Sequence, residues 1–238
     1  MNGYLDMHQH VIYGVDDGPQ TLEESMAMLA ADRADGITHV VATSHAMPSM
    51  ERFPTERYIR HLNKLNQISA DKGLGVTIYG GCEVFYTEVA ARLLIAGELP
   101  TLAGSRYALI EFDPTSTFDA IVTALRRLTN KGLIPVIAHC ERYEALVKHP
   151  RESVALRESF RVRLQVNAST IIGRVPRPVR KFRDLLLDEG VLDYIATDAH
   201  NTAARKPNLG EAYRAIEKRY GAERADKLTR TNQNELFA

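Results

Sequence analysis

Imidazole and carboxylate side chains follow most of the short apolar segments of this chain, and this feature constrains the fold most. Seven strand-like segments alternate with longer amphipathic ones, a pattern typical of successive β-α units. Ligand-type residues follow six of the seven segments: His8 and His10, His45, Glu83, Glu111, His139, and Asp198 with His200. The fold must therefore bring six strand ends together if these side chains act as one group.

The strands are expected at 3–8, 38–43, 76–82, 107–112, 134–138, 163–166 and 192–196. Helices are expected at 21–36, 56–72, 88–96, 118–131, 151–160, 179–189 and 203–219, with a short one from 222. Thr21 and Glu24 have the spacing of a capping box, which predicts the start of the first helix, and Gly36 predicts its end.

Two architectures suit repeated β-α units: an open doubly wound sheet and a closed barrel. An open sheet collects ligands at one switch point, whereas a barrel brings all of its strand ends to one mouth. Because the ligand-type residues follow six strands, the sequence favours an α/β fold with a distorted seven-stranded (β/α)7 TIM-like barrel. The 238 residues suit one domain spanning 1–238.

Composition excludes several classes of protein. Thirty basic residues balance thirty acidic ones, so no overall field favours nucleic acid. The start of the chain does not have the pattern of a secretory signal, and no apolar run is long enough for membrane insertion, so a cytoplasmic location is expected.

Cys82 and Cys140 are expected to be small core residues. Neither is followed six residues later by arginine, which excludes the cysteine-based tyrosine phosphatase mechanism.

The clustered side chains predict a multinuclear metal centre. Imidazole and carboxylate are ligands of catalytic divalent metals, and burying several carboxylates together without cations would be very costly. Asp17 is the expected ligand in the Asp16-Asp17-Gly18-Pro19 segment, with Asp16 as its adjacent rival and a turn-capping role as the alternative.

Several motifs carry a resemblance to a known superfamily. They are His8-Gln9-His10, Val15-Asp16-Asp17-Gly18-Pro19, Thr43-Ser44-His45, Gly81-Cys82-Glu83, Ile110-Glu111-Phe112, His139 with Glu141-Arg142-Tyr143, and Asp198-Ala199-His200-Asn201. Together they resemble the polymerase and histidinol phosphatase (PHP) superfamily. Within it, the chain is most similar to the bacterial metal-dependent tyrosine-protein phosphatases of capsule and exopolysaccharide loci, over nearly its whole length.

The resemblance implies the roles of these residues. The first metal would be held by His8, His10, Glu83 and Asp198, the second by Glu83, Glu111 and His139, and the third by Asp17, His45 and His200. Arg142 and Arg205 match the family's phosphate-binding arginines. It also implies two to three divalent ions, with manganese expected and iron, zinc, cobalt or magnesium as alternatives. The implied substrate is phosphotyrosine on the tail of an autophosphorylating bacterial tyrosine kinase.

The chemistry of phosphate esters agrees with this expectation. Hydrolysis of a dianionic ester needs cations beside its oxygens and a nucleophile near neutral pH, which a metal-bridging hydroxide would supply. Two other hypotheses remain: a small-molecule phosphoesterase of the superfamily, such as histidinol phosphatase, and a metal-stabilised docking module without activity. A monomer and a ring-shaped homo-oligomer are both compatible with the sequence.

Some residues have alternative interpretations. Arg142 and Arg205 could form ordinary salt bridges with Glu141, Glu144 or Glu211. Asn167 and Asn201 could orient ligands or occupy turns. One segment departs from the family. After His45, where relatives often have basic residues, this chain has Ala46-Met47-Pro48-Ser49-Met50, which removes positive charge from a rim loop expected to contact the substrate.

Overall fold

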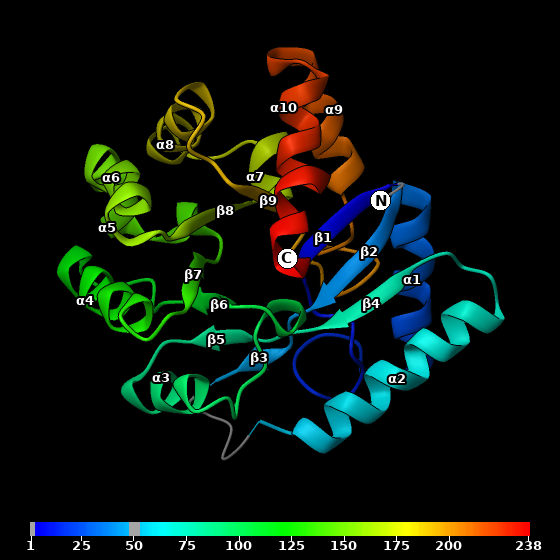
Figure 1. Cartoon of the computed structure of the whole chain (residues 1–238). Helices are drawn as coiled ribbons and strands as arrows, with labels where there is room; N and C mark the ends of the chain where they lie inside the picture. The colour runs from blue at the N-terminus through cyan, green and yellow to red at the C-terminus, as the bar shows by residue number, and fades with distance from the viewer. Residues whose placement is uncertain (1–2, 48–52) are drawn as a thin grey trace.

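Parallel strands and their connecting helices make up the computed structural model, which describes residues 3–47 and 53–238 (Figure 1). The strands are β1 (Tyr4–Gln9), β2 (Ile37–Ala42), β3 (His45–Ala46), β4 (Thr77–Gly80), β5 (Glu83–Phe85), β6 (Tyr107–Glu111), β7 (Ile134–Ile137), β8 (Arg163–Asn167) and β9 (Tyr194–Ala196). The helices are α1 (Leu22–Asp35), α2 (Thr55–Asp71), α3 (Glu88–Ile95), α4 (Phe118–Thr129), α5 (Glu144–Lys148), α6 (Pro150–Phe160), α7 (Ala168–Ile172), α8 (Arg177–Asp188), α9 (Leu209–Tyr220) and α10 (Ala222–Asp226).

The predicted α/β class is confirmed, but the strands do not form a single seven-stranded sheet. Within the described residues they form a three-stranded sheet, ordered β1-β2-β4, and a six-stranded sheet, ordered β3-β5-β6-β7-β8-β9. The expected strand 38–43 ends at Ala42 and the chain resumes as β3, while 76–82 ends at Gly80 and resumes as β5. Each of these two expected strands is therefore interrupted.

Tyr58 explains the interruption. Its hydroxyl donates to the carbonyl oxygen of Ala42 at 2.7 Å and accepts a hydrogen bond from the amide of Gly81 at 2.8 Å. A side chain on α2 thus takes up the backbone groups that would otherwise continue the pairing of β2 with β4. The chain turns at both positions, and β3 and β5 pair with each other beyond the break.

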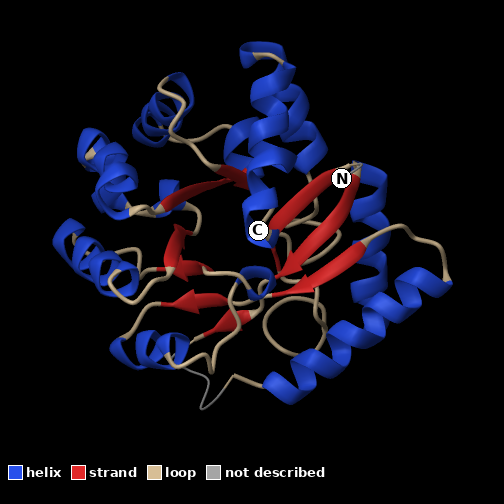
Figure 2. Cartoon of the chain, viewed as in Figure 1, coloured by secondary structure: helices blue, strands red, loops and turns tan. Residues whose placement is uncertain are grey.

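The two sheets still surround one site. At the end of β1, the amide of Asp198 donates to the carbonyl of His8 at 2.8 Å, and the amide of His10 donates to the carbonyl of Ala199 at 2.9 Å. These bonds join the first strand to the segment that follows β9. Figure 2 shows the resulting ring of strands with most of the helices outside it.

Helix starts and ends agree with local sequence signals in most places. Thr21 and Glu24 form the predicted capping box of α1, and Gly36 ends that helix in the left-handed conformation. Helix α9 begins at Leu209, later than predicted, because the side chain of Asn201 accepts hydrogen bonds from the amides of Ala203 and Arg205. These bonds hold a loop at the edge of the site, and that loop carries Arg205.

Two apolar clusters stabilise the ring. The larger one lies between the strands and the outer helices, and a smaller one that includes Met7, Leu109 and Leu236 fills the ring itself. Figure 1 shows the C-terminus at the centre of the ring. There Glu235 accepts a hydrogen bond from Arg163, at the start of β8, at 2.7 Å. The C-terminal segment therefore covers the amino ends of the strands, on the side opposite the ligand-type residues.

Candidate metal centre

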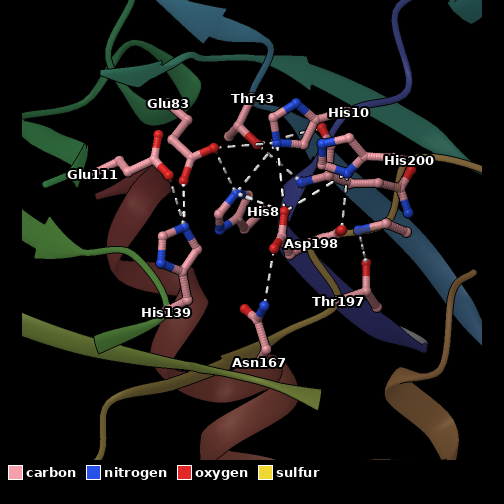
Figure 3. A network of polar contacts seen from close by, with 12 residues as sticks. His8, His10, Thr43, Glu83, Glu111, His139, Asn167, Thr197, Asp198 and His200 are labelled. Carbon is pink, nitrogen blue, oxygen red and sulfur yellow. Dashed lines mark hydrogen bonds and ion pairs between the residues drawn. The ribbon is translucent and has the colours of Figure 1, made fainter. Parts of the chain in front are cut away.

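The structure brings together all nine side chains that the sequence proposes as metal ligands. Three groups of donor atoms could each hold an ion: His8, His10, Glu83 and Asp198; His45, Glu83 and Glu111; and His10, Asp17, His45 and His200. Figure 3 shows most of these side chains converging from the strand ends. Metal binding by these groups is the natural hypothesis, because they offer imidazole nitrogens and carboxylate oxygens at one place.

Four atoms of the first group have the spacing of a coordination shell. His8 Nε2 lies 3.2 Å from Glu83 Oε2 and 3.5 Å from Asp198 Oδ1. His10 Nε2 lies 3.3 Å and 3.6 Å from the same two oxygens, and 3.4 Å from His8 Nε2. Donors placed tetrahedrally about 2.1 Å from one ion would be about 3.4 Å apart. The four side chains therefore fit a single divalent ion.

Glu83 also faces a second group. Its Oε1 lies 2.9 Å from His139 Nε2, which is in turn 3.6 Å from Glu111 Oε1. On the other side, His45 Nδ1 lies 3.2 Å from Glu83 Oε2 and 3.9 Å from Glu111 Oε2. One carboxylate thus stands between two groups of donors, which is the arrangement of a bridging ligand.

Asp17 lies at the outer edge of the site. Its Oδ1 is 3.4 Å from His45 Nε2 and 3.3 Å from His200 Nε2. Asp16, its rival from the sequence, instead contacts His10 Nδ1 at 2.8 Å and accepts a hydrogen bond from the amide of His45 at 3.0 Å. The structure therefore places Asp17 among the candidate ligands and Asp16 behind them.

Hydrogen bonds fix the orientation of three imidazoles. Gln165 Oε1 accepts a hydrogen bond from the amide of His139 at 2.7 Å, so this atom is an acceptor. In its second hydrogen bond, with His8 Nδ1 at 3.1 Å, the proton must therefore come from His8. His10 Nδ1 is bonded to the Asp16 carboxylate, and His200 Nδ1 lies 3.0 Å from the carbonyl oxygen of Asp198. Each Nδ1 thus carries the proton, which leaves each Nε2 free to bind a metal.

The carboxylates have strongly perturbed acidity. Burial alone would raise the pKa of Glu83, but the nearby imidazoles, with His8 foremost, outweigh it and lower this pKa well below its usual range. Burial raises the pKa of Glu111 to about 7, and the neighbouring charge of Glu83 adds to the increase. Burial lowers the pKa of His45 to about 4, with the charge of His10 adding to it. These pKa shifts favour a bound cation. A cation would stabilise the charged form of both carboxylates, and His45 already has the neutral form that metals bind.

Unpartnered donor atoms support the fit to metal ions. Glu83 Oε2 and His45 Nδ1 are buried and 3.2 Å apart, yet neither has a hydrogen-bond partner among the described residues. Buried polar atoms normally have one. Both residues belong to the candidate ligand groups, so a bound cation would satisfy these atoms.

A polar network supports these side chains, and it includes Asn167, which the sequence suggested as an orienting residue. Gln165 Nε2 donates to Asn167 Oδ1 at 2.9 Å, and Asn167 Nδ2 donates to Asp198 Oδ2 at 2.9 Å. On the far side of the site, Tyr143 Oη lies 3.3 Å from His139 Nδ1. Gln165 was the missed residue; its signal was a second polar residue on the same face of the strand as Asn167.

The backbone is constrained at two of the candidate ligands. Among the described residues, four that are not glycine have positive φ, and two of these are His139 at 31° and Asp198 at 55°. Such conformations are costly for ordinary residues and concentrate at functional sites.

Both predicted phosphate-binding arginines reach the site. Arg142 Nη2 donates to Asp198 Oδ2 and Arg205 Nη2 donates to Asp198 Oδ1, each at 2.8 Å. They therefore share one carboxylate instead of pairing with the glutamates considered from the sequence. The side chains are 46% and 39% exposed, so each guanidinium also faces the open mouth of the site.

The remaining candidate residues lie elsewhere. Cys82 and Cys140 are buried, unpaired thiols, and burial raises the pKa of both, so neither is an activated nucleophile. His61 stacks on Tyr13 and His149 lies beside Glu152, away from the three groups. The unusual segment after His45 continues into residues 48–52, which lie outside the described residues.

Fold and site together define a parallel α/β protein with three groups of candidate metal ligands at its strand ends. The chain belongs to the capsular polysaccharide synthesis CpsB/CapC family, whose model matches residues 4–238. It is 34% identical to the tyrosine-protein phosphatase CpsB of Streptococcus pneumoniae over 98% of each chain. None of the helices in the described residues has the length and apolar character needed to cross a membrane.

Two solved structures are similar to this chain, one at the level of the family and one at the level of the fold. A chain from the crystal structures of YwqE from Bacillus subtilis and CpsB from Streptococcus pneumoniae, described as metal-dependent tyrosine phosphatases, matches with a TM-score of 0.88 and 25% identity, covering 98% of this chain and 94% of that one. A histidinol phosphate phosphatase from Lactococcus lactis shares the fold, with a TM-score of 0.56 and 14% identity over 94% of each chain. The predicted relationship to the PHP-type tyrosine phosphatases is confirmed.

Proposed function

We propose that this protein is a metal-dependent protein-tyrosine phosphatase. The observation that carries the proposal is the set of four donor atoms from His8, His10, Glu83 and Asp198, spaced at 3.2 to 3.6 Å beside two arginines. The substrate would be phosphotyrosine on the tail of an autophosphorylating tyrosine kinase that controls capsule or exopolysaccharide synthesis in the cytoplasm. Support comes from the family and from the names of its relatives.

The donor geometry suggests how three ions would be shared. His10 contributes to two groups, but Asp16 occupies its Nδ1, so its single free nitrogen fits best with His8. We assign His8, His10, Glu83 and Asp198 to the first ion, Glu83, Glu111 and His139 to the second, and Asp17, His45 and His200 to the third. Manganese is the proposed metal.

The charges of the site suit a phosphate ester. Four carboxylates carry four negative charges, so three divalent ions would leave a surplus of two positive charges. This surplus would balance the two negative charges of the substrate dianion. When bound, the ions would lower the pKa of a water molecule and offset the charge of the phosphate. Arg142 and Arg205 would bind the nonbridging oxygens through forked hydrogen bonds, with their exposed faces turned to the substrate.

The leaving group also suits this site. A tyrosine phenol has a pKa of about 10, so its departure needs less help from a proton donor than the departure of an alkyl alcohol. Histidinol phosphate, the substrate of the second hypothesis, has an alkyl leaving group. A direct comparison of the two substrates therefore separates the proposed activity from the alternative.

The test is phosphate release by the manganese-loaded protein from a phosphotyrosine peptide and from histidinol phosphate. The proposal predicts faster turnover of the peptide, loss of turnover in His139→Ala, and normal turnover in the control His149→Ala, an exposed histidine outside the site. Faster turnover of histidinol phosphate would assign the protein to that branch. Turnover of neither would favour a docking module.

The network behind the ligands gives a separate prediction. Replacing Gln165 by leucine removes the acceptor that orients His8 and leaves the amide of His139 unpaired. Loss of such an orienting partner typically weakens metal binding about 10- to 100-fold. Calorimetric titration of metal-stripped protein with Mn²⁺ measures this effect.

Two further variants serve as comparisons in that titration. Gln165→Glu keeps the acceptor for His8, so it should bind metal better than the leucine variant. Gln67→Leu, at an exposed position on α2, should bind like the parent protein. Equal affinity of Gln165→Leu and the parent would contradict a role in orienting His8.

A further inference from the structure

A basic pocket outside the metal centre has no part in the proposed reaction. It has a volume of about 620 Å³ and lies between α5, α6 and α8. Four cations line it, Lys148, Arg151, Arg177 and Lys181, over apolar side chains that include Phe182 and Leu185. We call these residues the basic pocket. Figure 1 shows the three helices side by side on one flank of the ring.

The charge of this region is unlike that of the whole chain. The chain balances thirty basic with thirty acidic residues, but the segment 173–183 contains five basic residues and no acidic one. No residue of the first turn of α8 is acidic, although the amino end of a helix favours negative charge. Cations at this end of the helix are electrostatically unfavourable, and a bound anion would offset this unfavourable free energy.

Two of the four cations have no carboxylate partner among the described residues. Lys148 lies 2.7 Å from Glu144, and Arg151 pairs with Glu189. Arg177 and Lys181 are exposed and have no carboxylate within 4.0 Å in the part of the chain that the structure describes. They occupy positions i and i+4 on one helix, so their side chains lie on the same face and can bind one anionic segment.

Two of the helices that line the basic pocket start on the side of the ring that holds the metal centre. Helix α5 begins two residues after Arg142, and α8 follows β8 and α7, so both arise from loops at the carboxyl ends of strands.

We propose that the basic pocket docks an acidic segment of the protein substrate that flanks its phosphotyrosine. This rests on the proposed phosphatase function and adds a source of substrate selection to it. Carboxylates of the peptide would pair with Arg177 and Lys181, while aliphatic parts of the peptide would contact Leu185. A nucleic acid fits less well, because Phe182 is 1% exposed and offers no ring face for a base.

The test compares two charge reversals with the same spacing. Arg177→Glu/Lys181→Glu changes the basic pocket, and Arg214→Glu/Lys218→Glu changes two exposed positions on α9 as the control. Values of kcat/KM are measured for phosphotyrosine peptides with acidic or neutral flanks and for phenyl phosphate. We expect the first variant to lose about tenfold on the acidic peptide only, and the control to lose nothing.

A binding assay keeps this test independent of catalysis. Fluorescence anisotropy of an acidic peptide without phosphate measures docking directly, and we expect weaker binding to the Arg177→Glu/Lys181→Glu variant than to the control. Such a difference, with no hydrolysis of any phosphotyrosine substrate by the parent, would reject the phosphatase function and retain the docking site.

Two results would overturn the proposal. One is equal loss, or no loss, in both variants for the acidic peptide. The other is unchanged peptide binding combined with loss of binding to vesicles of phosphatidylglycerol, which would assign the basic pocket to a membrane surface.

Discussion

Replacing Glu83 by glutamine should lower kcat for phosphotyrosine hydrolysis about 1,000-fold or more. Glu83 contacts the Nε2 atoms of His8, His10 and His139, as well as Nδ1 of His45, so one carboxylate serves two of the proposed ions. Glutamine keeps the shape but removes the charge and offers only one oxygen. Bound manganese, measured by mass spectrometry, should fall together with kcat.

Glu98→Gln is the matched control, because this glutamate is exposed and outside the three groups. It should keep both activity and bound metal. Circular dichroism should show that Glu83→Gln remains folded, since the substitution also removes a buried charge. A folded Glu83→Gln protein with normal kcat would contradict the proposed bridging role.

Replacing either Arg142 or Arg205 by alanine should lower kcat/KM about 100-fold, for a phosphotyrosine peptide and for phenyl phosphate alike. Each arginine lies at the open mouth and now holds one oxygen of Asp198. Lysine at the same position should restore only part of the activity, because it keeps the charge but loses the forked donor geometry. Steady-state kinetics of the alanine and lysine variants measure both effects.

Arg33→Ala, an exposed arginine on α1, is the control and should leave kcat/KM unchanged. The Arg177→Glu/Lys181→Glu substitutions in the basic pocket should, in contrast, leave kcat/KM for phenyl phosphate unchanged. If Arg142→Ala and Arg205→Ala impaired peptide turnover but not phenyl phosphate turnover, the arginines would bind the peptide and not the phosphate.

Local signals predicted much of the fold. The capping box of Thr21 and Glu24 and the final Gly36 define α1, because their effect depends only on neighbouring backbone. Apolar runs with turn residues around them located β6 and β7 to within one residue of the predicted ends. Such features act within a few residues, so a pattern in the sequence suffices to predict them.

Other parts of the fold depend on contacts between distant residues. The break between β2 and β3 follows from the hydroxyl of Tyr58, which reaches Ala42 from α2. The hydrophobic pattern of 38–43 cannot reveal that contact, because Tyr58 lies outside this segment. The late start of α9 similarly follows from a side chain, Asn201, that takes the amides of the loop.

The candidate site was easier to predict than its support. Ligand types are restricted to few residues, so clusters of histidine and carboxylate stand out in a sequence. The residues behind them have common chemistry: Gln165, Asp16 and Tyr143 are identifiable only once the structure shows which imidazole each one contacts. The contact of Asp16 with His10 also depends on geometry, since Asp16 and Asp17 are adjacent in the sequence.

The most direct test of the metal-dependent mechanism is a paired titration of metal-stripped protein with Mn²⁺. Bound ions and phosphate release from a phosphotyrosine peptide are measured in the same samples. The account predicts no release without metal and full activity once two to three ions are bound per chain. Full activity in the presence of chelator, with less than about 0.1 ion bound per chain, would contradict it.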